Sequence, residues 1–220
     1  MRRPKHGLPF DVLHEDRNFI VIDKPAGLLT THTRLRGRLA RETQQTAENL
    51  LNEYLRKGQS RSRLRVWLVH RLDRDTSGVM MFAKSRRAAE AMRDRWNEIT
   101  SKVYVARVEG RLERNSGSFR SFLAEDADGY RVRSVPPGTP GAKAARTDWR
   151  KLSGDGKYTE VEVYLRSGRK NQIRVHFAEA GHPVAGDVKY GGAKAERMFL
   201  HSAVLKYTDP FTGKEMEFRA

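Results

Sequence analysis

Cysteine is absent from this chain of 220 residues, and aromatic residues make up only 9% of it. Without cysteine there can be no disulfide bond, no thiolate nucleophile and no cysteine-ligated zinc or iron–sulfur centre. The sequence also has no run of about 18 apolar residues, the length that a transmembrane helix needs. The first ten residues, MRRPKHGLPF, lack the apolar segment of a secretory signal. We therefore expect a soluble cytoplasmic protein with no membrane partner.

Several catalytic and nucleotide-binding motifs are missing as well. The sequence contains no GxxxxGK[ST] or GxGxxG phosphate loop, no GxSxG elbow and no HExxH pair. The two acids of Asp73-Arg74-Asp75 resemble a DxD metal motif, but the cation between them disfavours a divalent ion. The sequence therefore predicts neither a metal ion nor a cofactor.

Positive charge is what the chain has in abundance. It carries 43 Lys and Arg residues against 27 Asp and Glu, a formal net charge of +16. Such a surface attracts polyanions, which makes nucleic acid the leading partner, although a soluble protein can also simply be basic. The segment RKGQSRSRLR, residues 56–65, has five basic residues and no acid. It is either a solvated loop or a loop that contacts phosphates.

Apolar spacing predicts an α+β protein. Strands are expected at 19–23, 66–69, 79–83, 102–110, 158–166, 199–207 and 215–220. Helices are expected at 47–55, from a Ser85 cap to residue 99, and from an Asn171 cap to Gly181. Because strands outnumber helices without strict alternation, the sheet should be largely antiparallel or mixed. We expect one domain over 1–220, with a flexible tail at 1–10 and a surface loop at 134–143.

The segment HRLDRDTSG, residues 70–78, places charged groups between two apolar runs. Burying an ion costs several kcal/mol unless it is paired and hydrogen-bonded. A carboxylate beside arginine stays ionised, so Asp73 can act as a base or a nucleophile. The residues alone favour an Asp–Arg pair that only fixes the tight turn at Thr76-Ser77-Gly78, because ion-pair networks commonly have this role.

This segment resembles the signature of the RluA-type pseudouridine synthases, in which HRLD, two variable residues and TSG follow one another. Four further stretches resemble that family in the same order. They are DKPAGL at 23–28, KVYVARVEG at 102–110, GRKNQIRVH at 168–176, and GHPVAGDVKYGG followed by FLHSA at 181–203. The resemblance runs from about Phe10 to the end of the chain.

The resemblance implies a bent, mixed and largely antiparallel sheet with flanking helices and a central RNA-binding cleft. It implies that the protein isomerises specific uridines to pseudouridine in structured RNA, in rRNA or tRNA stem-loops, without a cofactor. The stretch before Asp23 is too short for the S4-type RNA-binding domain of many members, so the chain is similar to the single-domain members. A monomer is expected.

The same resemblance implies roles for individual residues. Asp73 would be the essential catalytic acid, Tyr104 would stack on the target uracil and could assist proton transfer, and Arg174 would pair with Asp73. The substrate-binding positions would be His70, Arg71, Leu72, Thr76, Arg169, Gln172 and Ile173. Each also has a purely structural interpretation: Tyr104 as a core residue, Arg174 on a helix surface and Arg71 as a partner of Asp73.

One departure from the family pattern concerns Asn171, which stands where histidine usually precedes Gln-Ile-Arg. Asparagine keeps a hydrogen-bonding group, so we expect activity to be retained. Without an S4 domain, target choice would depend on the catalytic domain, including loops 56–65 and 134–143.

Two other functions remain open from the sequence. A non-catalytic RNA-binding or ribosome assembly factor would use the same basic cleft, but binding alone gains nothing from an acid that faces phosphates. A nucleosidase that hydrolyses an N-glycosidic bond usually needs two separated carboxylates, and Asp75 is the only second acid near Asp73 in the sequence.

Overall fold

The computed structural model describes residues 7–32, 44–59 and 61–220. The chain forms two compact units, one of Met1–Thr100 with Ser202–Ala220 and the other of Ser101–His201. Residues 1–6 of the predicted flexible tail lie outside the described residues. Leu8 and Phe10 are buried, so the described part of that segment packs on the fold, which corrects the prediction there.

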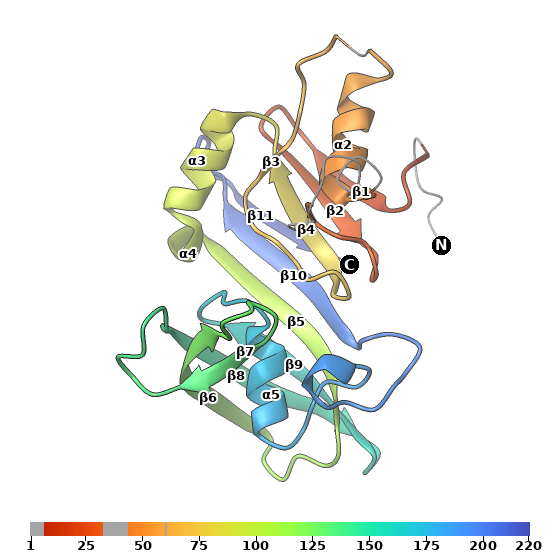
Figure 1. The fold of residues 1–220 in the computed structure, drawn as a ribbon. Helices are drawn as coiled ribbons and strands as arrows, with labels where there is room; N and C mark the ends of the chain where they lie inside the picture. The colour runs from red at the N-terminus through yellow and green to blue at the C-terminus, as the bar shows by residue number, and fades with distance from the viewer. Residues whose placement is uncertain (1–6, 33–43, 60) are drawn as a thin grey trace. The chain divides into compact units, whose positions relative to one another are not determined.

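The first unit contains a sheet with the order β1-β2-β4-β10, in which β11 also pairs with β10 and β3 with β4 (Figure 1). Its strands are β1 (Asp11–Glu15), β2 (Phe19–Lys24), β3 (Trp67–Leu68), β4 (Ser77–Ala83), β10 (Leu200–Thr208) and β11 (Glu215–Arg219). The pairs β1–β2, β2–β4, β3–β4 and β10–β11 are antiparallel. The chain therefore carries the residues just before and just after Asp73 as neighbouring strands, β3 and β4.

Helices of the first unit begin where the sequence places capping residues. The Oγ1 of Thr46 accepts a bond from Asn49 N at the start of α2 (Ala47–Arg56), and Ser85 caps α3 (Arg86–Asp94) in the same way. The predicted helix after Ser85 is divided, because α4 (Trp96–Ile99) follows as a separate short helix. The core combines one face of the sheet with α3: Phe19, Val21, Val69, Val79, Met81, Ala83, Ala88, Ala89, Met92, Leu205 and Tyr207.

The second unit contains five antiparallel strands in the order β5-β9-β8-β6-β7 (Figure 1). They are β5 (Thr100–Glu109), β6 (Ser116–Glu125), β7 (Val132–Val135), β8 (Lys143–Gly154) and β9 (Tyr158–Leu165). The helix α5 (Gln172–Glu179) packs on this sheet, and the short 3₁₀ helix η2 (Val188–Tyr190) follows it. Residues 136–142 connect β7 to β8 within the unit, which confirms the predicted surface loop.

The structure confirms the α+β class and the largely antiparallel pairing, to which the isolated bridge between Leu29 and Thr46 adds a parallel element. Around α5 the prediction is corrected. Asn171 precedes the helix but has left-handed backbone and makes no side-chain cap. Among the described residues, no helix is both long enough and apolar enough to span a membrane.

Candidate active site

Asp73 begins a tight turn that connects β3 with β4. Its carbonyl oxygen accepts a hydrogen bond from Thr76 N at 3.2 Å, so Arg74 and Asp75 occupy the corners of the turn. Those two side chains pair with each other, with Arg74 Nε 2.9 Å from Asp75 Oδ1, and both are solvent-accessible. Asp75 is thus engaged by Arg74. No group of acids and histidines suited to a metal occurs among the described residues.

Lys24 stabilises this turn through hydrogen bonds to backbone carbonyl oxygens. Its side chain is completely buried, and Nζ donates to the carbonyl oxygens of Pro25 and Leu28 at 2.8 Å and of Arg74 at 3.0 Å. Gly27 N also donates to Arg74 O at 2.9 Å. Burial lowers the pKa of Lys24 to about 8, although Asp75, Asp73 and Asp23 favour its charged form. The end of β2 therefore fixes the backbone next to Asp73.

The residues before Asp73 are also anchored through their backbone. Thr30 Oγ1 donates to Leu72 O at 2.8 Å and accepts from Leu72 N at 3.3 Å. His70 Nε2 accepts a hydrogen bond from Met81 N, and its ring stacks on Trp96 with centroids 4.7 Å apart. Leu72 is buried, whereas Arg71, two residues before Asp73 in the sequence, is exposed.

The segment Thr76-Ser77-Gly78 ends in glycine because the backbone conformation and the space at position 78 exclude a side chain. The φ of +109° at Gly78 is open to glycine, and a Cβ there would stand 2.7 Å from Ser202 N and still closer to Ser202 O. Only a residue without a side chain lets β4 approach the backbone of β10 so closely. Thr76 is buried just before this point.

Tyr104 lies in β5 of the second unit, opposite Val163 of β9. Tyr104, Ala106 and Val108 are buried, as their alternation along the strand predicts. Lys102 precedes Tyr104 on the same face of the strand, and burial lowers the pKa of Lys102 to about 8.

Arg174 is buried in α5, and its guanidinium group contacts Asp187, Asn171 and Tyr190. Its Nε and Nη2 donate to the two carboxylate oxygens of Asp187 at 2.7 and 2.8 Å, and Nη1 donates to Asn171 Oδ1 at 3.0 Å. The ring of Tyr190 lies 5.0 Å from the guanidinium carbon. Asn171 Nδ2 donates to Tyr190 Oη at 2.9 Å, which closes the network. Asn171, at the position of the departure from the family pattern, therefore bonds to both Arg174 and Tyr190.

The other predicted positions of the GRKNQIRVH segment have different surroundings. Gln172 Nε2 donates to Arg146 O and Thr147 Oγ1, while its Oε1 accepts from Ser167 Oγ and Arg169 N. These four bonds use the whole capacity of an amide, so Gln172 supports the start of α5. Ile173 is buried, and Arg169 is exposed with Nε bonded to Ala144 O.

Asp73 thus belongs to the first unit, and Tyr104 and Arg174 belong to the second. Their predicted meeting across a central cleft stays a prediction. Sequence reasoning gave no role to Lys24, Thr30, Asp187 or Tyr190, although Lys24 and Asp187 lie within the quoted stretches DKPAGL and GHPVAGDVKYGG. A lysine at the end of an apolar strand and an acid beyond a buried arginine were the available signals.

Comparison with known proteins places this arrangement in a family. The family model for RNA pseudouridylate synthase matches residues 18–179, well over half of the chain. The chain belongs to this family. It is an RNA pseudouridine synthase of the RluA type, an enzyme that isomerises uridine in RNA.

Individual relatives agree with this assignment. The chain is 33% identical to the RNA pseudouridine synthase YjbO of Bacillus subtilis over 97% of its own length and 72% of that protein. It is 33% identical to the dual-specificity RNA pseudouridine synthase RluA of Vibrio vulnificus, over 91% of its length and 78% of that protein. The structure of human RNA pseudouridylate synthase domain containing 4 shares the fold, with a TM-score of 0.75 at 22% identity over 95% of this chain and 87% of that one.

Proposed function

We propose that this synthase isomerises uridine in stem-loops of rRNA or tRNA with Asp73 as the essential catalytic residue. In this reaction the bond between N1 and C1′ of the target breaks, the uracil turns over, and C5 bonds to C1′ while it loses its proton. A carboxylate can act as nucleophile or base in these steps. The base has to leave its stack, which costs a few kcal/mol and favours targets in loops.

The observation that carries this proposal is how the backbone around Asp73 is fixed. Lys24 and Gly27 bind Arg74 O on one side, and Thr30 binds Leu72 on the other. Anchoring through main-chain atoms determines where the backbone holds Asp73. A catalytic group needs such support from its neighbours to keep a productive geometry.

Tyr104 and Arg174 complete the proposed set. Tyr104 would stack on the target uracil, a contact of about 1–3 kcal/mol for a base on an aromatic ring. Arg174 would stabilise the ionised form of Asp73. The fixed orientation of Arg174, which Asp187 and Asn171 provide, supports this role.

The test is tritium release from RNA labelled at uridine C5 and prepared from cells that lack this gene. We expect the wild type to release tritium in the presence of EDTA. Asp73→Asn should lower the single-turnover rate by at least about 10³-fold, because an amide cannot serve as base or nucleophile.

Asp75→Asn is the matched control, since it makes the same substitution in the same turn at an exposed acid that pairs with Arg74. It should keep most of the activity. Equal loss in both variants would assign the motif to turn structure. Binding without release by the wild type would favour the assembly-factor function, and free uracil among the products would favour the nucleosidase.

A further inference from the structure

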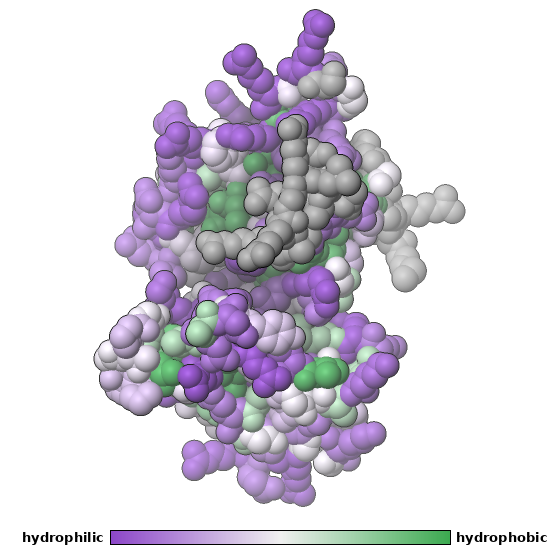
Figure 2. Space-filling model, in the orientation of Figure 1, coloured by the Kyte–Doolittle hydropathy of each residue, from purple (hydrophilic) through white to green (hydrophobic). Residues whose placement is uncertain are grey.

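A basic groove lies in the first unit, between the loop that follows α2 and the start of β3. Its volume is about 640 Å³, and it is open to solvent. The residues that line it are Arg56, Arg61, Ser62, Arg63, Leu64, Arg65, Trp67 and Lys84. We call this set the arginine groove. Figure 2 shows hydrophilic side chains that project at the top of the view, where Figure 1 places the loop after α2.

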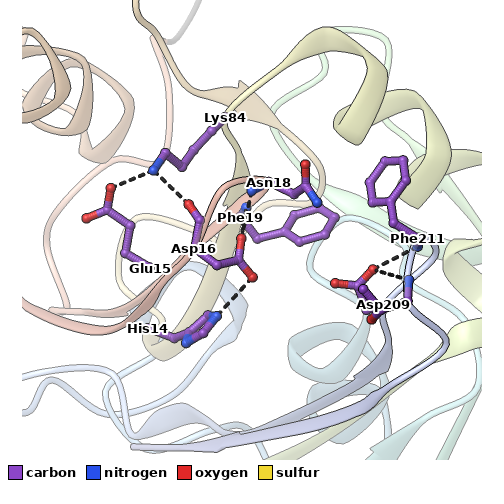
Figure 3. Close-up of polar contacts among 9 residues, drawn as sticks. His14, Glu15, Asp16, Asn18, Phe19, Lys84, Asp209 and Phe211 are labelled. Atoms are coloured by element: carbon purple, nitrogen blue, oxygen red, sulfur yellow. Dashed lines mark hydrogen bonds and ion pairs between the residues drawn. The ribbon is translucent and has the colours of Figure 1, made fainter.

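One cation of the arginine groove is already neutralised. Lys84 Nζ lies 2.7 Å from Glu15 Oε1 and 2.7 Å from Asp16 O, as Figure 3 shows. Glu15 also accepts from Tyr54 Oη at 2.8 Å, and Lys84 and Tyr54 together lower the pKa of Glu15 even though its partial burial opposes this. These contacts connect α2 to β1 and make Lys84 part of the wall.

Three arginines of the groove carry charge that no acid among the described residues neutralises. Arg61, Arg63 and Arg65 are exposed, and none forms an ion pair with an acid among the described residues. Other exposed arginines, such as Arg86 with Glu90, are paired. Like charges this close in sequence repel one another, so an anion in the groove would relieve that repulsion.

The backbone that carries these arginines is bonded to α2 near its C-terminal end. Arg56 Nε donates to Leu64 O at 3.1 Å, and Val66 N donates to Asn52 Oδ1 at 2.7 Å. The guanidinium carbon of Arg65 lies 4.0 Å above the ring of Trp67, which restricts that side chain. Ordered guanidinium groups lose less entropy when they bind a phosphate.

We propose that the arginine groove binds the sugar–phosphate backbone of the RNA substrate at a point away from the target uridine, which rests on the proposed function. Guanidinium groups form bidentate hydrogen bonds with phosphate oxygens, and release of counterions from RNA adds affinity. Leu64, which is 56% exposed, and Trp67 give the groove an apolar part against which a ribose or base can pack. A surface of this composition fits a polynucleotide.

The number of residues between the arginine groove and Asp73 limits the distance between the proposed RNA contact and the target uridine. Trp67 lies in β3 and precedes Asp73 by six residues. Six residues span at most about 20 Å. Successive phosphates of one helical strand are about 3.4 Å apart along the axis, so a phosphate bound beside Trp67 should lie within about six nucleotides of the target.

The experiment measures RNA affinity over a series of KCl concentrations by fluorescence anisotropy. It uses an rRNA or tRNA stem-loop that the wild type binds, and the full chain carrying Asp73→Asn, so that no uridine in the RNA is converted. Adding Arg61→Gln, Arg63→Gln and Arg65→Gln should weaken binding at least about tenfold near physiological salt. The slope of log K against log[KCl] should become less steep by about 2, since each lost phosphate contact removes about 0.7.

The matched control replaces three exposed arginines of the α3–α4 region, Arg86, Arg93 and Arg95, by Gln in the same background. Two of these already pair with acids, Glu90 and Glu98, so the slope should change by less than about 1. Thermal melting should show that both triple variants are folded. Equal effects of the two triple variants would overturn the proposal, because net charge alone would then explain the result.

A second readout locates the contact. Single neutral methylphosphonate linkages placed along the RNA should weaken binding most within about six nucleotides of the target, and this pattern should disappear in the groove variant. An unchanged pattern in the groove variant would overturn the proposal. Failure of the proposed function is recognised separately, because wild type would then release no tritium from any RNA while groove-dependent RNA binding could still be measured.

Discussion

The two units hold their predicted reactive side chains in opposite ways. Around Asp73 the first unit binds the main chain, through Lys24 to Arg74 O and through Thr30 to Leu72. Around Arg174 the second unit binds the charged group itself, through Asp187 and Asn171. An exposed turn has no regular structure of its own to fix it, whereas α5 already fixes the backbone of Arg174. The turn therefore needs backbone anchors, and the buried guanidinium needs partners for its charge.

The largest effect on stability is expected at Gly78, where the backbone of β4 lies close to the backbone of Ser202 in β10. Gly78→Ala should lower the free energy of unfolding by about 4 kcal/mol or more, because the methyl group meets the Ser202 backbone and φ is positive. Urea denaturation measures this. Gly27→Ala is the control, since Gly27 also has positive φ but no atom within 4 Å of the added Cβ. It should cost about 1 kcal/mol, and equal costs would assign the effect to backbone strain alone.

Replacing Lys24 tests whether hydrogen bonds to the main chain support the turn around Asp73. Lys24→Met should lower the free energy of unfolding by about 3 kcal/mol, since it leaves buried carbonyl oxygens without a donor and nearby carboxylates without a cation. Chemical denaturation at pH 7 gives the value. Lys84→Met removes a partly exposed lysine with an ion pair to Glu15 and should cost about 1 kcal/mol. A cost for Lys24→Met no larger than this would contradict its role as an anchor.

Replacing Asp187 tests whether its ion pair with the buried Arg174 stabilises the second unit. Asp187→Asn should lower the free energy of unfolding by about 2–3 kcal/mol, because the Arg174 guanidinium stays buried with a neutral partner. The comparison is Asp148→Asn, in which an acid paired with the exposed Arg146 and Arg166 is changed in the same way. That variant should lose less than about 1 kcal/mol. Equal losses would show that burial does not set the strength of the Arg174 pair.

The smallest effect is a pH dependence that belongs to the first unit. Burial lowers the pKa of Lys24 from 10.5 to about 8 in the folded protein, so the unfolded chain binds more protons between these values. Stability from this group therefore rises with pH in that window. The difference in unfolding free energy between wild type and Lys24→Met should grow by about 1 kcal/mol from pH 7 to pH 9. A constant difference would show that folding does not lower the pKa of Lys24, and a shrinking difference would contradict the predicted direction.

Local sequence determined much of the fold. Period-2 alternation placed Tyr104, Ala106 and Val108 on the buried face of β5, and Ser85 marked the start of α3. These features depend only on neighbours along the chain, so pattern rules recover them. The strands β1 and β6 were missed. The residues of β1, DVLHE, alternate weakly and are half-buried, and most of β6 is exposed or half-buried. In α5 every residue from Gln172 to Phe177 is buried, polar and apolar side chains alike.

By itself, the sequence determined the secondary structure classes, the basic charge, the family and the candidates Asp73, Tyr104 and Arg174. Only the tertiary structure decided what supports them. The bonds from Lys24 to Arg74 and from Arg174 to Asp187 join residues 50 and 13 positions apart, and no local pattern encodes such partners. The same holds for Gly78, whose constraint comes from Ser202 on another strand. Burial makes each of these contacts necessary, because a polar group taken out of water has to find its partner within the fold.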